Sequence, residues 1–333
     1  MMHSRSSLST TVSGCTYQSV WKERSPRAED RRNSFVGNVR LGASLEDAVS
    51  TTRSEPQTVK FRGSEDLTLV ADEWNRGVSG DRPTVLLLHG GGQNRFSWKN
   101  TGQILADQGL HVVALDSRGH GDSDRAPDAN YSVDALCADT LAVLEQIGRP
   151  VALIGASMGG MTGMLVADAA GPEKVTKLVL VDVVPRYEKD GSARIRDFMS
   201  SGIDGFESLD EAADAVAAYL PYRKKPRSPE GLKKNLRLRD GRWYWHWDPA
   251  FLTAPMDDPF VRVEKLERAV VESTIPILLI RGKLSDVVSA EGVKDFLEKV
   301  PRAEFVELSE AGHTAAGDDN DAFSEVVVQF VCK

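Results

Sequence analysis

The sequence contains little cysteine, no excess of positive charge and no long apolar run. Its only cysteines are Cys15, Cys137 and Cys332, and this number and spacing predict neither a disulfide framework nor a cysteine metal site. The net charge of −8 argues against a nucleic-acid partner and against a basic membrane-binding patch. No stretch reaches the roughly 18 consecutive apolar residues of a membrane-spanning helix. These absences predict a soluble protein in a reducing compartment, and we expect a cytoplasmic location.

The N-terminal 54 residues lack periodicity, and the first 22 of them also lack acidic residues. Residues 1–22 contain no Asp or Glu, and residues 1–54 are rich in Ser, Thr and Arg, with no apolar core of a secretory signal. We therefore expect residues 1–54 to form a disordered tail outside the folded domain. An organelle transit peptide is the alternative, because such segments are also rich in Ser and Arg and poor in acids.

From about residue 55, short apolar runs alternate with amphipathic segments of helical length. Continuous apolar runs are typical of strands buried on both faces of a sheet, and strict alternation of strand and helix predicts right-handed crossovers. An edge hairpin is expected before them, over residues 58–74. The sequence therefore predicts a doubly wound, mostly parallel α/β sheet. The expected buried strands are residues 84–89, 111–116, 151–154, 178–182, 275–280 and 304–308.

This alternation is interrupted between residues 185 and 268, where helical segments and Pro breaks occur. We expect an inserted helical cap over residues 185–268, which divides the α/β core into residues 55–184 and 269–333. The cap contains the segment Trp243-Tyr-Trp-His-Trp247.

The three tryptophans of this segment, Trp243, Trp245 and Trp247, alternate along the chain. In an extended conformation they share one face. Two interpretations remain open: the rings line an apolar substrate pocket, or they form the apolar core of the cap itself.

The motif Gly155-x-Ser157-x-Gly159 lies between an apolar strand and a helix that is expected to run from Met158 to Ala170. A serine at the tip of such a tight turn has a strained backbone, and its neighbours must be small because the strand and the helix nearly touch. The turn exposes the serine hydroxyl at a helix N-terminus, where backbone N–H groups attract negative charge. Ser157 is therefore the predicted nucleophile.

A serine nucleophile needs a base to accept its proton and an acid to orient that base. His313 follows the last predicted strand, and His89 and His120 lie in glycine-rich turns where a structural role is expected. We therefore predict His313 as the base, and His246, in the insertion, remains an alternative. Asp286, in the loop after the strand 275–280, is the preferred acid, and Asp182, directly at the end of its own strand, is the alternative. The chain order of serine, aspartate and histidine fits such a triad.

The segment His89-Gly90-Gly91-Gly92 follows another predicted strand. Two fixed N–H donors are needed to stabilise the oxyanion of a tetrahedral intermediate, and each contributes about 3–4 kcal/mol in the transition state. We expect the amides of Met158, directly after the nucleophile, and of Gly91 to supply them.

With these motifs, the chain resembles the α/β-hydrolase fold superfamily, in the branch of esterases, lactonases and cofactor-free haloperoxidase-like enzymes. The resemblance covers residue 57 to the C-terminus and implies that the insertion is a cap and that acyl groups pass to water through an acyl-serine. Relatives that hydrolyse epoxides or carbon–halogen bonds carry Asp at the position of Ser157, so the serine argues against those reactions. The matching pieces are His89-Gly90-Gly91, Asp116-x-Arg118-Gly119-His120-Gly121-x-Ser123, Gly155-x-Ser157-x-Gly159, Asp286 and Gly312-His313.

These observations predict a serine hydrolase that cleaves a small, fairly apolar ester, thioester or lactone without a metal or cofactor. One alternative is a cofactor-free haloperoxidase or perhydrolase, in which peroxide replaces water at the same acyl-enzyme. Another is a ligand sensor that keeps the triad without turnover. The expected partner is a small-molecule substrate, with no nucleic acid or membrane, and the sequence gives no indication of the oligomeric state.

Overall fold

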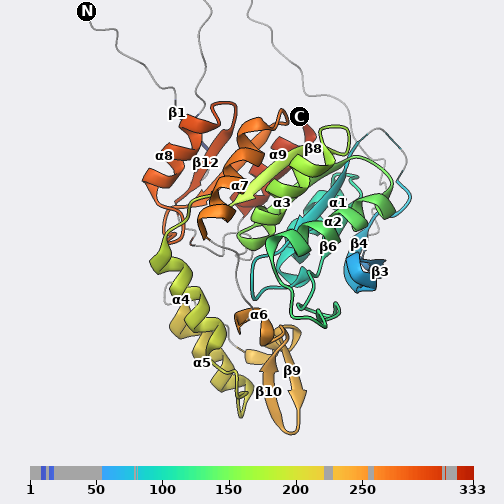
Figure 1. The fold of residues 1–333 in the computed structure, drawn as a ribbon, viewed down its shortest axis with the longest axis vertical. Helices are drawn as coiled ribbons and strands as arrows, with labels where there is room; N and C mark the ends of the chain where they lie inside the picture. The colour runs from blue at the N-terminus through green and yellow to red at the C-terminus, as the bar shows by residue number, and fades with distance from the viewer. Residues whose placement is uncertain are drawn as a thin grey trace, which may run out of the picture.

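The computed structural model describes residues 9–12, 15–18, 55–78, 80, 82–220, 228–253, 259–309, 312 and 321–333. Within these residues, a ten-stranded sheet carries helices on both faces, and a smaller cap extends from it (Figure 1). In the order of the sheet, the strands are β1 (Ser9–Val12), β2 (Cys15–Gln18), β12 (Glu304–Leu308), β11 (Ile277–Gly282), β8 (Val175–Val181), β7 (Val151–Ala156), β5 (Thr84–Leu88), β6 (Val112–Leu115), β4 (Thr68–Trp74) and β3 (Gln57–Arg62).

The six strands from β12 to β6 are parallel, and β3 and β4 form an antiparallel hairpin at one edge, joined by a short 3-10 turn, η1 (Ser64–Asp66). β4 pairs antiparallel with β6. The predicted doubly wound, mostly parallel sheet and its edge hairpin are therefore confirmed.

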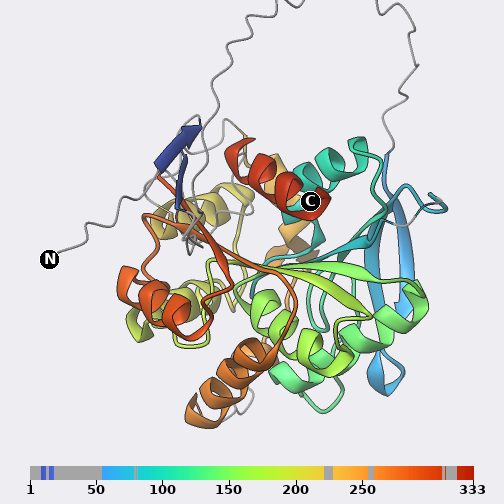
Figure 2. The ribbon, with the colours of Figure 1, turned by 90° about the horizontal axis from the view of Figure 1, so that it is seen from above.

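Helices cover the two faces of the sheet (Figure 2). Successive side chains of β5 show why both layers are needed: Leu86 and Leu88 pack with the helices of one face, and Val85 and Leu87 with those of the other. The first face carries α2 (Val133–Ile147), α3 (Met158–Ala170), α7 (Pro259–Glu272) and α8 (Ala290–Lys299), and the second carries η2 (Arg95–Trp98), α1 (Lys99–Asp107) and α9 (Asp321–Cys332).

The predicted disordered tail differs from the structure at two short segments. β1 and β2 form an antiparallel hairpin that extends the sheet beyond β12. Strands pair through hydrogen bonds of the backbone, so this hairpin could not be predicted from the side-chain pattern of the segment. The rest of residues 1–54 lies outside the described residues, and the boundary at residue 54 stays a prediction.

The cap is not purely helical, because it includes a two-stranded hairpin. The predicted boundary at residue 268 falls inside α7, whose residues Leu266, Ala269 and Val270 are buried in the core against the sheet. α7 therefore belongs to the core. The cap elements are α4 (Lys189–Ser200), α5 (Leu209–Tyr219), η3 (Pro229–Asn235), β9 (Leu236–Arg239), β10 (Arg242–Trp245) and α6 (Ala250–Thr253).

Among the helices that the structure describes, none has the length and apolar composition needed to cross a membrane.

Candidate active site

Ser157 occupies a strained turn between β7 and α3. Its φ of 47° and ψ of −113° lie outside the regions that an L-residue normally adopts. A Cβ atom at Gly155 would lie 2.3 Å from the carbonyl oxygen of Gly159, and one at Gly159 would lie 2.3 Å from that of Leu88. Only glycine fits at both positions, so the turn holds Ser157 at the carboxyl end of the central strand β7.

The glycine-rich loop after β5 lies directly beside this serine. A Cβ atom at Gly90 would lie 3.5 Å from the Cβ atom of Ser157. The Gly90 amide donates to Gln93 Oε1 at 3.0 Å, and the Gly92 amide donates to His120 Nε2 at 3.2 Å.

These bonds hold the loop on both sides of Gly91. No residue in the described part of the chain accepts a hydrogen bond from the Gly91 or Met158 amide. Two oriented donors beside the Ser157 hydroxyl can stabilise a negatively charged oxygen without reorganisation.

Three buried imidazoles hold the loops around this site. The Ser117 amide donates to His89 Nε2 at 3.0 Å, so the His89 Nδ1–H donates to the Gly90 carbonyl at 2.8 Å. The ring of His120 lies 5.1 Å from that of His89 and 6.0 Å from that of His246. Burial lowers the pKa of His89 to about 4 and that of His120 to about 3. Both rings are therefore neutral acceptors near neutral pH, in the structural role that the sequence predicted.

These depressed pKa values predict a loss of stability in mild acid. Below about pH 6.5 the unfolded chain binds a proton at each histidine, whereas folded His89 stays neutral until about pH 4. As the pH falls from about 6.5 to about 4, the effect of His89 alone should therefore lower the free energy of unfolding by about 3 kcal/mol. Urea unfolding of the wild type and of His89→Gln across this range tests the prediction. The free energy of unfolding should fall less steeply with decreasing pH in the variant than in the wild type. Equal slopes would contradict the depressed pKa of His89.

Asp182 is fully buried at the end of β8, the strand beside β7. The amide of Ser157 donates to the carbonyl of Val181, the residue before Asp182, at 3.1 Å. Asp182 Oδ1 accepts from the Gly282 amide at 3.1 Å, and Oδ2 accepts from the Ser285 hydroxyl at 2.6 Å. The carboxylate is therefore held in one orientation next to the serine turn, and each of its oxygens can accept more than one hydrogen bond.

Asp286, the preferred acid of the sequence analysis, is placed differently. Its carboxylate is 36% exposed and pairs with Arg194 of cap helix α4 at 2.8 Å. α4 also packs closely on the backbone here, because a Cβ atom at Gly191 would lie 2.3 Å from the Asp286 carbonyl oxygen. Asp286 therefore contacts the cap.

The predicted base, His313, lies outside the described residues. Its neighbour Gly312 is buried, and β12 ends at Leu308, two strands from β8 in the sheet. The role of His313 stays a prediction.

A cavity of about 890 Å³ lies between the core and the cap. Ser157, Gly91 and Met158 all line it, so the structure brings three of the predicted site residues together. Most of its other walls are apolar. They include Leu136 and Met161 of the core and residues from α4, α5 and α6 of the cap.

Trp245 and Trp247 line this cavity, and Trp243 does not. The two lining rings stack with centroids 4.8 Å apart, and both are buried in the apolar cluster of the cap. Trp245 and Trp247 therefore line the cavity and also belong to the apolar core of the cap, as the two interpretations of the sequence separately proposed. Trp243 is half-buried and packs against the cap cluster.

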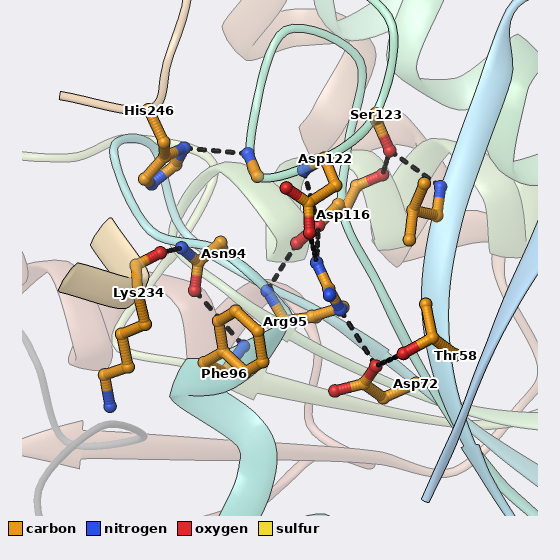
Figure 3. A network of polar contacts seen from close by, with 12 residues as sticks. Thr58, Asp72, Asn94, Arg95, Phe96, Asp116, Asp122, Ser123, Lys234 and His246 are labelled. Carbon is orange, nitrogen blue, oxygen red and sulfur yellow. Dashed lines mark hydrogen bonds and ion pairs between the residues drawn. The ribbon is translucent and has the colours of Figure 1, made fainter. Parts of the chain in front are cut away.

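A largely buried charge network connects the core loops beside this site to the cap, and sequence reasoning did not identify it. Figure 3 shows its core part around Arg95. Arg95 donates to Asp72 at 2.9 Å and to Asp122 at 2.8 Å, and it also pairs with the fully buried Asp116. The other oxygen of Asp122 accepts from Arg237 of β9 at 2.6 Å. The motif around Asp116 was the only part of this network that the sequence singled out, because Asp72, Arg95 and Arg237 come from segments that are distant in the chain.

Two further contacts fix the hairpin side of the cap to the core loops (Figure 3). The Gly121 amide donates to His246 Nδ1 at 2.7 Å, and the Asn94 side chain donates to the Lys234 carbonyl at 3.1 Å. His246 therefore accepts a backbone hydrogen bond, as the other two imidazoles do.

No group of His, Cys, Asp and Glu within the described segments is arranged to hold a metal ion.

Comparisons with known proteins agree with this geometry. The family model described as alpha/beta hydrolase fold matches residues 83–319. An esterase of Mycobacterium tuberculosis, Rv0045c, is 30% identical over 74% of this chain and 82% of its own length. The mouse sn-1-specific diacylglycerol lipase ABHD11 is 27% identical over 75% of this chain and 81% of its own length. A crystal structure of an alpha/beta hydrolase from Novosphingobium aromaticivorans has a TM-score of 0.70 and 29% identity, and covers 84% of this chain and 98% of its own.

Proposed function

The chain belongs to the α/β-hydrolase fold family and is an ester-hydrolysing enzyme, and on this premise we propose that it is a serine hydrolase acting through an acyl-serine at Ser157. The observation that carries the proposal is the strained serine in the wall of an apolar cavity, beside two backbone amides without described acceptors. Hydrolysis of a panel of aryl esters by the wild type and by Ser157→Ala tests it.

The proposed reaction uses the chain's own groups throughout. The Ser157 hydroxyl attacks the ester carbonyl, and His313 accepts its proton. The amides of Gly91 and Met158 donate to the oxyanion of the tetrahedral intermediate. His313 returns the proton to the leaving alcohol, and a water molecule then attacks the acyl-serine, with His313 again acting first as base and then as acid.

We propose Asp182 as the acid that orients His313, in place of Asp286. The support is its complete burial, its position at the strand end beside Ser157 and its two fixed hydrogen bonds. A buried carboxylate keeps the imidazole in the correct tautomer and stabilises the imidazolium that forms during the reaction. Asp286, by contrast, is paired with Arg194.

We propose that the substrate is an ester, thioester or lactone with a largely apolar acyl group. The cavity of about 890 Å³ is within the range of small-molecule sites, which is about 300–1,000 Å³. The stacked rings of Trp245 and Trp247 provide a rigid apolar wall for such a group.

Replacing Trp245 or Trp247 with Ala is expected to shift the preferred acyl group toward longer or bulkier chains, because each change enlarges the cavity. The same changes should cost about 3–5 kcal/mol of stability, because both rings are buried in the cap cluster. Trp243→Ala is the matched control, since this ring does not line the cavity. Hydrolysis rates over a series of acyl lengths, together with melting temperatures, check the prediction. Unchanged acyl preferences in both lining variants would contradict it.

A further inference from the structure

The cavity beside Ser157 carries positive charge in a protein whose net charge is −8. Three charged side chains line it in the described part of the chain, and all three are cations: Arg196, Lys234 and Arg262. No described Asp or Glu lines it. Since most of the remaining described wall is apolar, the charged side chains known to line the cavity all attract a negatively charged group.

Arg262, on core helix α7, differs from the other two cations in its surroundings. Arg196 and Lys234 are exposed, whereas Arg262 is half-buried. Its Nε atom is fully buried and has no hydrogen-bond partner among the described residues. Its Nη2 atom donates to the hydroxyl of Tyr187 at 2.6 Å.

The arginines that are buried in the described part of the chain are neutralised by carboxylates. Arg95 pairs with Asp72 and Asp116, Arg118 pairs with Asp139, and Arg281 pairs with Glu307. Within the described residues, no carboxylate lies within ion-pair distance of Arg262. A buried guanidinium N–H without an acceptor is costly, because its hydration is lost and not replaced.

The pair of Arg262 and Tyr187 offers donors to the cavity. The Tyr187 hydroxyl accepts from Arg262, and its own hydrogen is donated to no described residue. A guanidinium presents planar N–H groups whose spacing matches the two oxygens of a carboxylate, and such charge-assisted bonds are among the stronger ones in proteins.

We infer that Arg262, assisted by the Tyr187 hydroxyl, binds a free carboxylate of the substrate. The preferred substrates are then esters with a largely apolar chain and a second, ionised carboxyl group at its far end. This inference deepens the proposed function and rests on it. Arg262 acts here as a specificity-determining residue and takes no part in the transfer of the acyl group.

The test uses matched pairs of esters with the full-length protein. Each pair contains an aryl hemi-ester of a dicarboxylic acid and the neutral ester in which a methyl ester caps the free carboxyl group, over a series of chain lengths. In a second set of esters, the free carboxylate is on the alcohol part. Comparison of the two sets identifies whether the acyl or the alcohol part faces Arg262. The variants are Arg262→Met, Arg262→Lys and the control Arg268→Met, an exposed arginine of the same helix that does not line the cavity.

For the wild type we expect kcat/KM to favour the carboxylate-bearing ester at one chain length. Arg262→Met should lower kcat/KM for that ester about ten- to a hundredfold, mainly through KM, and leave the neutral ester nearly unchanged. Arg262→Lys should retain part of the preference, and Arg268→Met all of it. Equal losses on both esters, or no loss on either, would overturn the inference while leaving ester hydrolysis intact. Failure of the wild type to hydrolyse any ester would contradict the proposed function itself.

Discussion

Replacing Asp182 with Asn is expected to lower kcat about 10⁴-fold, because an amide no longer holds the imidazole of the base in its reactive tautomer. Asp182 is fully buried and fixed by Gly282 and Ser285, so the substituted side chain stays in place beside Ser157. Steady-state kinetics with an activated aryl ester measure the effect, and circular dichroism and the melting temperature confirm that the variant folds.

Asp286→Asn is the matched comparison. It breaks only a half-exposed ion pair with Arg194, and such pairs contribute about 0–1 kcal/mol. Its kcat should therefore stay within about tenfold of the wild type. If Asp286→Asn proves the more damaging of the two folded variants, the role of the acid returns to Asp286, as the loop position in the sequence suggested.

Replacing Ser157 with Ala is expected to lower kcat about 10⁶-fold, toward the residual rate that binding and the oxyanion donors sustain. The variant should fold normally, because alanine removes only the hydroxyl from a turn whose close packing depends on Gly155 and Gly159. Ser192→Ala is the control, since this serine of α4 lines the same cavity. A Ser157→Ala variant that retains substantial hydrolysis after repeated purification would exclude the acyl-serine route.

The core elements were predictable where hydrophobic periodicity was continuous. β12 has the bounds that the sequence indicated, and the helix after Ser157 runs from Met158 to Ala170 as expected. A sheet buried on both faces requires apolar runs, and these runs are visible without knowledge of the tertiary contacts.

Elements that depend on distant contacts were not predictable. The hairpin of β9 and β10 is short, and its strands carry charged and aromatic residues that also suit a helix. The predicted cap boundary at residue 268 includes most of α7, because the few apolar residues of this helix indicate a core position only once the sheet they pack against is known. Arg262 could not be singled out for the same reason, since its inferred role depends on the lack of a carboxylate within ion-pair distance among the described residues.

The candidate site was predictable in part. The motifs indicated Ser157, Gly91 and Met158, and these residues line one cavity. The choice between Asp182 and Asp286 was not decided by spacing, because both follow strands at the same edge of the sheet. The proposal of Asp182 is based on its burial and on the pairing of Asp286 with Arg194, and both facts arise from packing between segments far apart in the chain.

The most direct test of the central claim is labelling with a fluorophosphonate, which reacts with activated serines. After peptide mapping by mass spectrometry, the label is expected on Ser157 of the wild type, in proportion to the loss of esterase activity, and absent from Ser157→Ala. Labelling of Ser192 or of any other serine, or full inhibition without a label on Ser157, would contradict the assignment of the nucleophile.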